Sequence, residues 1–133
     1  GGTNAVSTAV SAAIDALPGI GAPRRISGDD RYATAVEVAR AVAGIGPDGL
    51  DVPVLGWHEV GLATGLDFPA ALAGGAACGA RGGVLLLTLP DTLAPATKTA
   101  LEEARLRTHR VTVLGGTNVV TETVRLAAGS AIQ

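Results

Sequence analysis

The sequence predicts an α/β fold in which a mostly parallel sheet of about four strands is covered by helices on both faces. Short apolar runs of Val and Leu alternate with Ala-rich stretches of helical length, the pattern of strands and helices in layered α/β proteins. The chain has 133 residues, about one domain, and 47% of them are apolar although only three are aromatic. We therefore expect a core closely packed from small side chains.

Four segments are predicted to be strands. The clearest is residues 83–88, a continuous apolar run typical of a central strand that is covered on both faces. Residues 110–114 and 60–64 are each stopped by glycine, and residues 25–28 form a fourth, short strand expected at an edge. Residues 52–55 are a weaker strand candidate within a loop rich in Gly and Pro.

Five helices are predicted between and around these strands. Asp30 is placed to cap the helix that starts at Arg31, and Pro69 suits a first helical turn. Phe68 is expected in the core, whereas Trp57, in the loop, is the aromatic residue expected to be exposed. Cys78 lies in an Ala-rich helix and is interpreted as a reduced core thiol. The predicted helices span about residues 31–43, 68–79, 95–106, 121–128 and 7–17.

The two ends of the chain are related by an internal repeat. Residues 1–14 align with residues 115–128, both starting Gly-Gly-Thr-Asn, and half of the fourteen aligned residues are identical. This predicts a tandem array, with residues 1–20 as the last helix of a preceding repeat or a linker, and residues 21–133 as one module. The helix of residues 7–17 has no sheet of its own, so we expect its apolar face to dock on the following domain or on another chain.

Composition disfavours several functions. A formal net charge of −2 gives no basic field for nucleic acid, and no apolar run reaches the roughly 20 residues needed for membrane insertion. Cys78, His58 and His109 have no local partners at metal-ligand or nucleophile spacing, so neither a metal, a cofactor nor catalysis is predicted.

Four motifs occur in order along the chain: Arg25-Ile-Ser-Gly-Asp-Asp-Arg-Tyr-Ala-Thr-Ala35, Leu62-Ala-Thr-Gly-Leu-Asp-Phe-Pro-Ala-Ala-Leu72, Gly83-Val-Leu-Leu-Leu-Thr88 and Val113-Leu-Gly-Gly116. In order and spacing they resemble the cell wall binding repeat 2 family, over about residues 24–128. The resemblance implies a compact Rossmann-like or Toprim-like fold. It also implies a secreted or surface-layer protein of a Gram-positive bacterium that is held on the cell wall through anionic secondary polymers, with modules packed around a threefold or pseudo-threefold axis. The Ala-rich and Arg-rich composition favours an actinobacterial source.

One position departs from the family pattern. Phe68-Pro69 is usually followed by Asp, but here by Ala70, which puts the binding site in doubt while leaving the fold prediction intact. Asp67, three residues earlier, could serve the same helix amino terminus.

Two glycine turns are candidate anion sites. Gly115 and Gly116 follow a strand and precede a helix, where backbone N–H groups can hold a phosphate, but the same residues also make a tight structural turn. Gly65 and Asp67 lie in an equivalent turn, at the carboxyl edge of the sheet where open α/β folds place ligands. Neither turn carries a dinucleotide-binding glycine motif or the lysine of a P-loop.

Two charged clusters have similar alternatives. Arg31 is expected to form a structural ion pair within the cluster Asp29, Asp30 and Arg31, or with Asp67, unless it contacts a ligand or a neighbouring module. A second cluster gathers at a helix carboxyl end, either as a solvated cap or as a patch for polymer phosphates or carboxylates. Its members are Arg105, Arg107, His109 and Arg110.

The function predicted from these observations is a non-catalytic module that binds anionic wall polymer and packs with sister repeats or with copies of itself, most plausibly as a trimer. The alternatives are a self-association or spacer module without polymer affinity and, less favoured, a small enzyme domain with a phosphate ligand.

Overall fold

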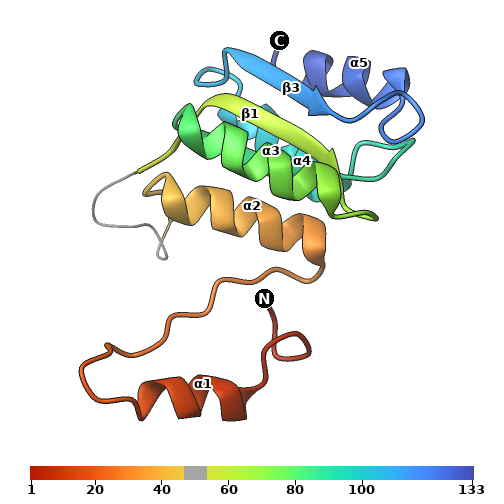
Figure 1. Cartoon of the computed structure of the whole chain (residues 1–133). Coiled ribbons are helices and arrows are strands. Elements are labelled where there is room, and N and C mark those ends of the chain that lie inside the picture. Colours follow the sequence, from red (N-terminus) through yellow and green to blue (C-terminus); the bar gives the residue numbers. More distant parts are fainter. Residues whose placement is uncertain (47–53) are drawn as a thin grey trace.

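A computed structural model describes residues 1–46 and 54–133 and confirms an α/β fold with a parallel sheet (Figure 1). The sheet lies between helices, and helix α1 stands apart from these layers at the amino end of the chain (Figure 1). In chain order the elements are α1 (Thr8–Asp15), α2 (Arg31–Val42), β1 (Gly56–Thr64), α3 (Pro69–Ala80), β2 (Gly83–Thr88), α4 (Pro95–Ala104), β3 (Arg110–Leu114) and α5 (Glu122–Ala131).

The sheet of the described residues has three strands rather than about four, in the order β2-β1-β3, and both pairings are parallel. The prediction of a strand at residues 25–28 is wrong: the segment joins no sheet, and its hydrogen bonds at Arg25 and Ile26 go to Gly1. Residues 52 and 53 of the weaker strand candidate lie outside the described residues. Val54 and Leu55 are not in a strand, and their N–H groups donate to the carbonyl of Val42.

The strand expected at the centre of the sheet lies at its edge. β1 occupies the centre, and residues 60–64 in it are all buried. In β2, Val84 and Leu86 are buried, and Leu85 and Leu87 are half-buried, because helices α2 and α3 both pack against this strand. The apolar run of β2 therefore predicted correctly that the strand is largely buried, but it did not predict the position of the strand in the sheet.

The helices cover both faces of the sheet, as predicted. The connection from β1 to β2 runs through α3 in one direction, and that from β2 to β3 runs through α4 in the other. Because such connections are right-handed, the two helices must lie on opposite faces. Helix α3 approaches its face closely: a Cβ at Gly61 would overlap the Sγ of Cys78, and one at Gly74 would overlap Leu114.

The main core lies on the opposite face, and it corrects two predictions for aromatic residues. Trp57 belongs to β1 rather than to a loop, and it is buried at 5% exposure. Phe68 directly precedes α3 and is 70% exposed, because the inward side of this helix is formed by small residues. The buried cluster brings together residues from α2, the sheet, α4 and α5, including Val36, Val60, Leu62, Leu86, Leu101 and Val124.

Candidate functional site

The carboxyl edge of the sheet brings together five of the predicted site residues. β1 ends at Thr64 and β3 at Leu114, and parallel strands end at the same edge, so the turns at residues 65–68 and 115–121 share that edge. Arg31, at the start of α2, joins them because its Nη1 donates a 2.6 Å hydrogen bond to the carbonyl oxygen of Gly65. The site residues at this edge are Arg31, Gly65, Asp67, Gly115 and Gly116.

The turn at Gly65 is held by its neighbours. The hydroxyl of Thr64 accepts a hydrogen bond from the N–H of Leu66 at 3.2 Å, which fixes the chain as it leaves β1. A Cβ at Gly65 would lie 2.6 Å from a ring carbon of Tyr32, so only glycine fits beneath this ring. Asp67 is exposed just beyond the turn.

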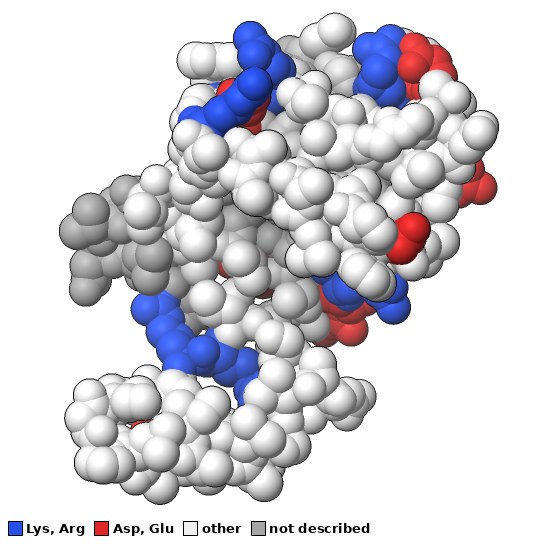
Figure 2. Space-filling model, in the orientation of Figure 1, with Lys and Arg blue, Asp and Glu red and all other residues white. Residues whose placement is uncertain are grey.

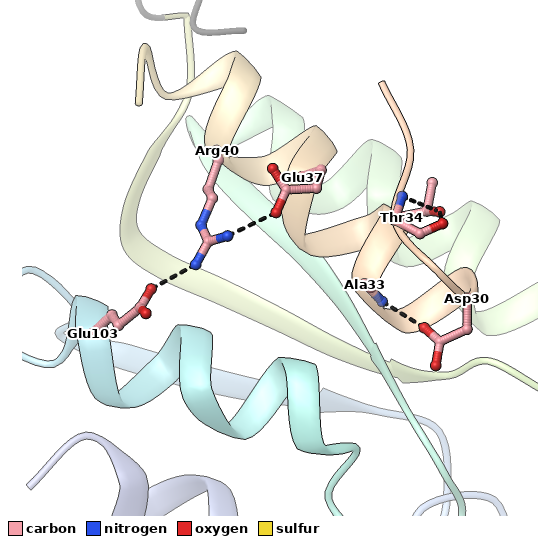
Figure 3. Close-up of polar contacts among 7 residues, drawn as sticks. Asp30, Ala33, Thr34, Glu37, Arg40 and Glu103 are labelled. Atoms are coloured by element: carbon pink, nitrogen blue, oxygen red, sulfur yellow. Dashed lines mark hydrogen bonds and ion pairs between the residues drawn. The ribbon is translucent and has the colours of Figure 1, made fainter. Parts of the chain in front are cut away.

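Arg31 does not make the predicted ion pair with Asp29 or Asp30: the salt bridges of the described residues include none that involves Arg31. Asp30 instead caps α2, as expected, with its Oδ1 accepting from the N–H of Ala33 at 2.7 Å (Figure 3). The guanidinium of Arg31 binds the main-chain carbonyl of Gly65, and Asp29 is exposed.

The predicted basic patch lies at the opposite edge. Arg105 and Arg107 follow α4, and Arg110 starts β3, so all three are near the amino ends of the strands. All three are exposed, and Arg110 lies 4.0 Å from the carboxylate of Glu59, which also accepts from Arg81 at 2.9 Å. The residues predicted as candidate polymer contacts are therefore divided between the two edges of the sheet. Figure 2 shows basic side chains in separate clusters, several beside acidic ones, with uncharged surface between them.

The second glycine turn is tight and exposed. Gly115 has φ of 112°, a conformation that favours glycine, and the N–H groups of Val119 and Val120 donate to the carbonyl of Gly116 at 2.8 and 3.1 Å. Residues 115–118 are all exposed. This geometry fits the structural interpretation of the turn and leaves its outer surface open to a partner.

Two features were missed from the sequence. An apolar groove of about 380 Å³ runs along the edge strand β2 between α2 and α3, and its walls include Val38, Phe68, Leu72, Leu85 and Leu87. The four-residue spacing of Phe68 and Leu72 was the available signal, since it puts both side chains on one side of a helix.

The second missed feature is an ion-pair bridge between helices. Arg40 of α2 contacts Glu37 at 2.7 Å and Glu103 of α4 at 2.6 Å (Figure 3). Partial burial lowers the pKa of Arg40, but the hydrogen bonds and charges of Glu103 and Glu37 outweigh this effect, so the pKa is raised above its ordinary value. This bridge joins α2 to α4 and is structural.

The described residues contain no group of three or more His, Cys, Asp or Glu side chains that could hold a metal ion. Cys78 is buried, and this burial raises the pKa of its thiol. Within residues 1–46 and 54–133, every helix is too short or too polar to cross a bilayer.

The described residues form a small parallel α/β domain, and the predicted site residues at its carboxyl edge lie in surface turns. The chain belongs to the cell wall binding domain 2 family. The family model matches residues 25–125, from the segment before α2 into α5. A search of curated proteins gives no match for the chain.

Proposed function

We propose that this module anchors a secreted bacterial protein to the cell wall without catalysis, by binding anionic wall polymers and packing with sister modules. Membership of a cell wall binding family supports the general role. The observation that carries the polymer hypothesis is the exposed guanidinium of Arg31 at the carboxyl edge, where one donor is fixed by Gly65 and no carboxylate pairs with it among the described residues. A guanidinium has five N–H donors, so the others can bind a phosphate or carboxylate.

The carboxyl edge is the primary polymer surface in this proposal. Arg31 acts there with the backbone turns at Gly65 and Gly115-Gly116. The exposed carboxylate of Asp67 lies just beyond the first of these turns and bounds the site on that side. Ala70, in place of the usual Asp, leaves the first turn of α3 without a carboxylate. At the other edge, Arg105, Arg107 and Arg110 form a secondary surface, weakened by the nearby carboxylate of Glu59.

Sedimentation with purified cell walls tests the proposal. The chain should pellet with intact walls, remain in solution after the anionic polymers are stripped, and dissociate as salt is raised. Arg31→Glu should release the module from walls, whereas Lys98→Glu, an exposed charge reversal on α4, should not. Binding that survives both polymer removal and high salt would contradict an ionic mechanism.

The division of the basic residues between two edges makes the test sharper. Release by Arg31→Glu, but not by the triple change of Arg105, Arg107 and Arg110 to Glu, assigns the polymer to the carboxyl edge. The opposite result assigns it to the amino edge and overturns the primary site.

A self-association or spacer module is the second candidate function, and the apolar groove beside β2 is the observation that favours it. We expect the isolated module to form a closed trimer in that case, as threefold packing of sister modules implies. A module that oligomerises but never pellets with walls would establish this alternative. The source, a Gram-positive and specifically actinobacterial cell surface, remains part of the proposal, whereas the small phosphate-ligand enzyme is the least favoured candidate.

A further inference from the structure

The Gly-Gly-Thr-Asn turn occurs twice in the chain, and its two copies have the same backbone structure. In the first turn (residues 1–5), the N–H of Ala5 and that of the next residue, Val6, both donate to the carbonyl of Gly2 at 3.0 Å. In the second turn (residues 115–119), the N–H of Val119 and that of the next residue, Val120, both donate to the carbonyl of Gly116. Each copy is followed by a helix, α1 or α5. The two turns are therefore the same structural unit.

The first turn has a binding partner in this structure. The amino group of Gly1 donates to the carbonyl of Ile26 at 2.9 Å, and Nη1 of Arg25 donates to the carbonyl of Gly1 at 2.6 Å. The turn then faces the start of α2 across a cavity of about 660 Å³. We call the surface that holds it the receiving surface, and it consists of Arg25, Ile26 and residues 28–31.

Among the described residues, the second turn makes no such contact. Residues 115–118 have the same sequence as residues 1–4 and, like residues 1, 3 and 4, they are exposed. We infer that the second turn docks on the receiving surface of an adjacent copy of the module, with Arg25 of that copy donating to the carbonyl of Gly115. The contacts that the first turn makes supply the geometry. This inference rests on the proposed packing of sister modules and names the surfaces that meet.

The contact joins two different surfaces, so each module offers one turn and one receiving surface. Repetition of such a heterologous contact builds a ring or an open row of modules. It also fits the finding that residues 25–28 belong to no sheet: Arg25 and Ile26 contact the turn, and the N–H of Gly28 donates to the hydroxyl of Thr34 in α2.

Peptide binding to the module tests the inference without any wall material, so its failure is distinguishable from failure of the polymer proposal. The receptor is residues 21–133, whose buried cluster, drawn from residues 36–131, contains nothing from the removed segment. Acetylated peptides of residues 1–7 and 115–121 are each titrated into the isotope-labelled module, and a scrambled peptide serves as the control. Both peptides should shift the amide signals of residues 25–31 and compete with each other.

Two variants and the full chain complete the test. Arg25→Ala should weaken both peptides roughly two- to tenfold, the effect of one hydrogen bond, while Arg107→Ala at the opposite edge should not. The full chain should bind either peptide more weakly than residues 21–133, because its own first turn occupies the receiving surface at high effective concentration. The inference is overturned if neither peptide binds, if only the first binds, or if the shifts fall outside the receiving surface.

Discussion

Helices α1 and α5 are two copies of one sequence pattern in opposite environments. Val10 aligns with Val124 and Leu17 with Ala131, at a constant offset in the repeat. In α5 these positions are 0% and 8% exposed, whereas Val10 in α1 is 48% exposed and Leu17, just beyond the end of α1, is 49% exposed. An apolar helix face thus predicts that the face will be buried. Whether it is buried depends on which other elements pack against it.

The difference lies in what each helix packs against. α5 packs on α4 and β3, and its Val124 belongs to the same buried cluster as Leu101. α1 has no buried residue. Its Ile14, together with Val6 just before the helix, lines a cavity with residues 23–26. Among the described residues, this helix therefore does not pack into the core of the following domain as expected, whereas the turn before it contacts Arg25 and Ile26. Docking on another chain remains a prediction.

The largest contrast should come from placing a charge in both helices at aligned positions. Val124→Asp should cost about 3–5 kcal/mol, because it buries a carboxylate without a partner. Val10→Asp should change the free energy of unfolding by less than about 0.5 kcal/mol, since this side chain is already exposed. Urea unfolding of both variants measures the difference, and equal losses would show that α1 is covered in solution.

A second substitution, in the sheet, tests the buried cluster against which α5 packs. Leu86→Ala should destabilise the domain by roughly 2–5 kcal/mol, because it opens a cavity in the cluster that also holds α5. Leu72→Ala, at a 68% exposed position on α3, is the matched control and should have little effect. A normal urea midpoint for the Leu86 variant would mean that the main core has been misassigned.

Hydrogen exchange should separate the helices without any substitution. Amides in α5 should exchange only when the domain unfolds, because that helix is part of the core. Amides in α1 should exchange rapidly, since an isolated helix of eight residues is marginal in water. Strong protection of α1 at low protein concentration would contradict its exposure, whereas protection that grows with concentration would reveal docking between chains.

The smallest contrast concerns the helix caps. The hydroxyl of Ser7 accepts from the N–H of Val10 at 3.3 Å, whereas that of Thr121 makes no capping bond and is buried without a partner. Ser7→Ala should therefore reduce the helicity of α1 and leave global stability unchanged, at a local cost of about 1 kcal/mol. Thr121→Ala should be neutral or slightly stabilising, because it removes an unsatisfied hydroxyl. Circular dichroism and urea unfolding measure both, and a large global loss for either variant would contradict these assignments.

Local signals explain most of the successful predictions. Asp30 caps α2 as expected because a cap depends on residues within one helical turn. The strands at residues 60–64, 83–88 and 110–114 were found because short apolar runs, two of them stopped by glycine, are local signals too. The segment at residues 25–28 was misassigned because it pairs with no strand: Arg25 and Ile26 contact a turn more than twenty residues away, and Gly28 contacts Thr34 of α2.

The candidate site was predictable only in parts. Gly65 and Gly115 were found as strand-to-helix turns, and the parallel sheet places both at one edge. Arg105 and Arg110, like Arg31, were candidates for polymer binding because of their charge, yet charge gives no information about which edge of the sheet a residue occupies. The sequence could not reveal that separation, since it depends on the direction of every strand.

The sequence by itself determined the α/β class, the three sheet strands, the helices and the repeated turn, because each depends on neighbouring residues or on direct comparison of two segments. Only the tertiary structure decided that β1 rather than β2 is central, that Trp57 is buried while Phe68 is exposed, and that α5 is covered while α1 is not. These outcomes depend on which distant surfaces meet. The free energy of burial belongs to such contacts and not to any one segment.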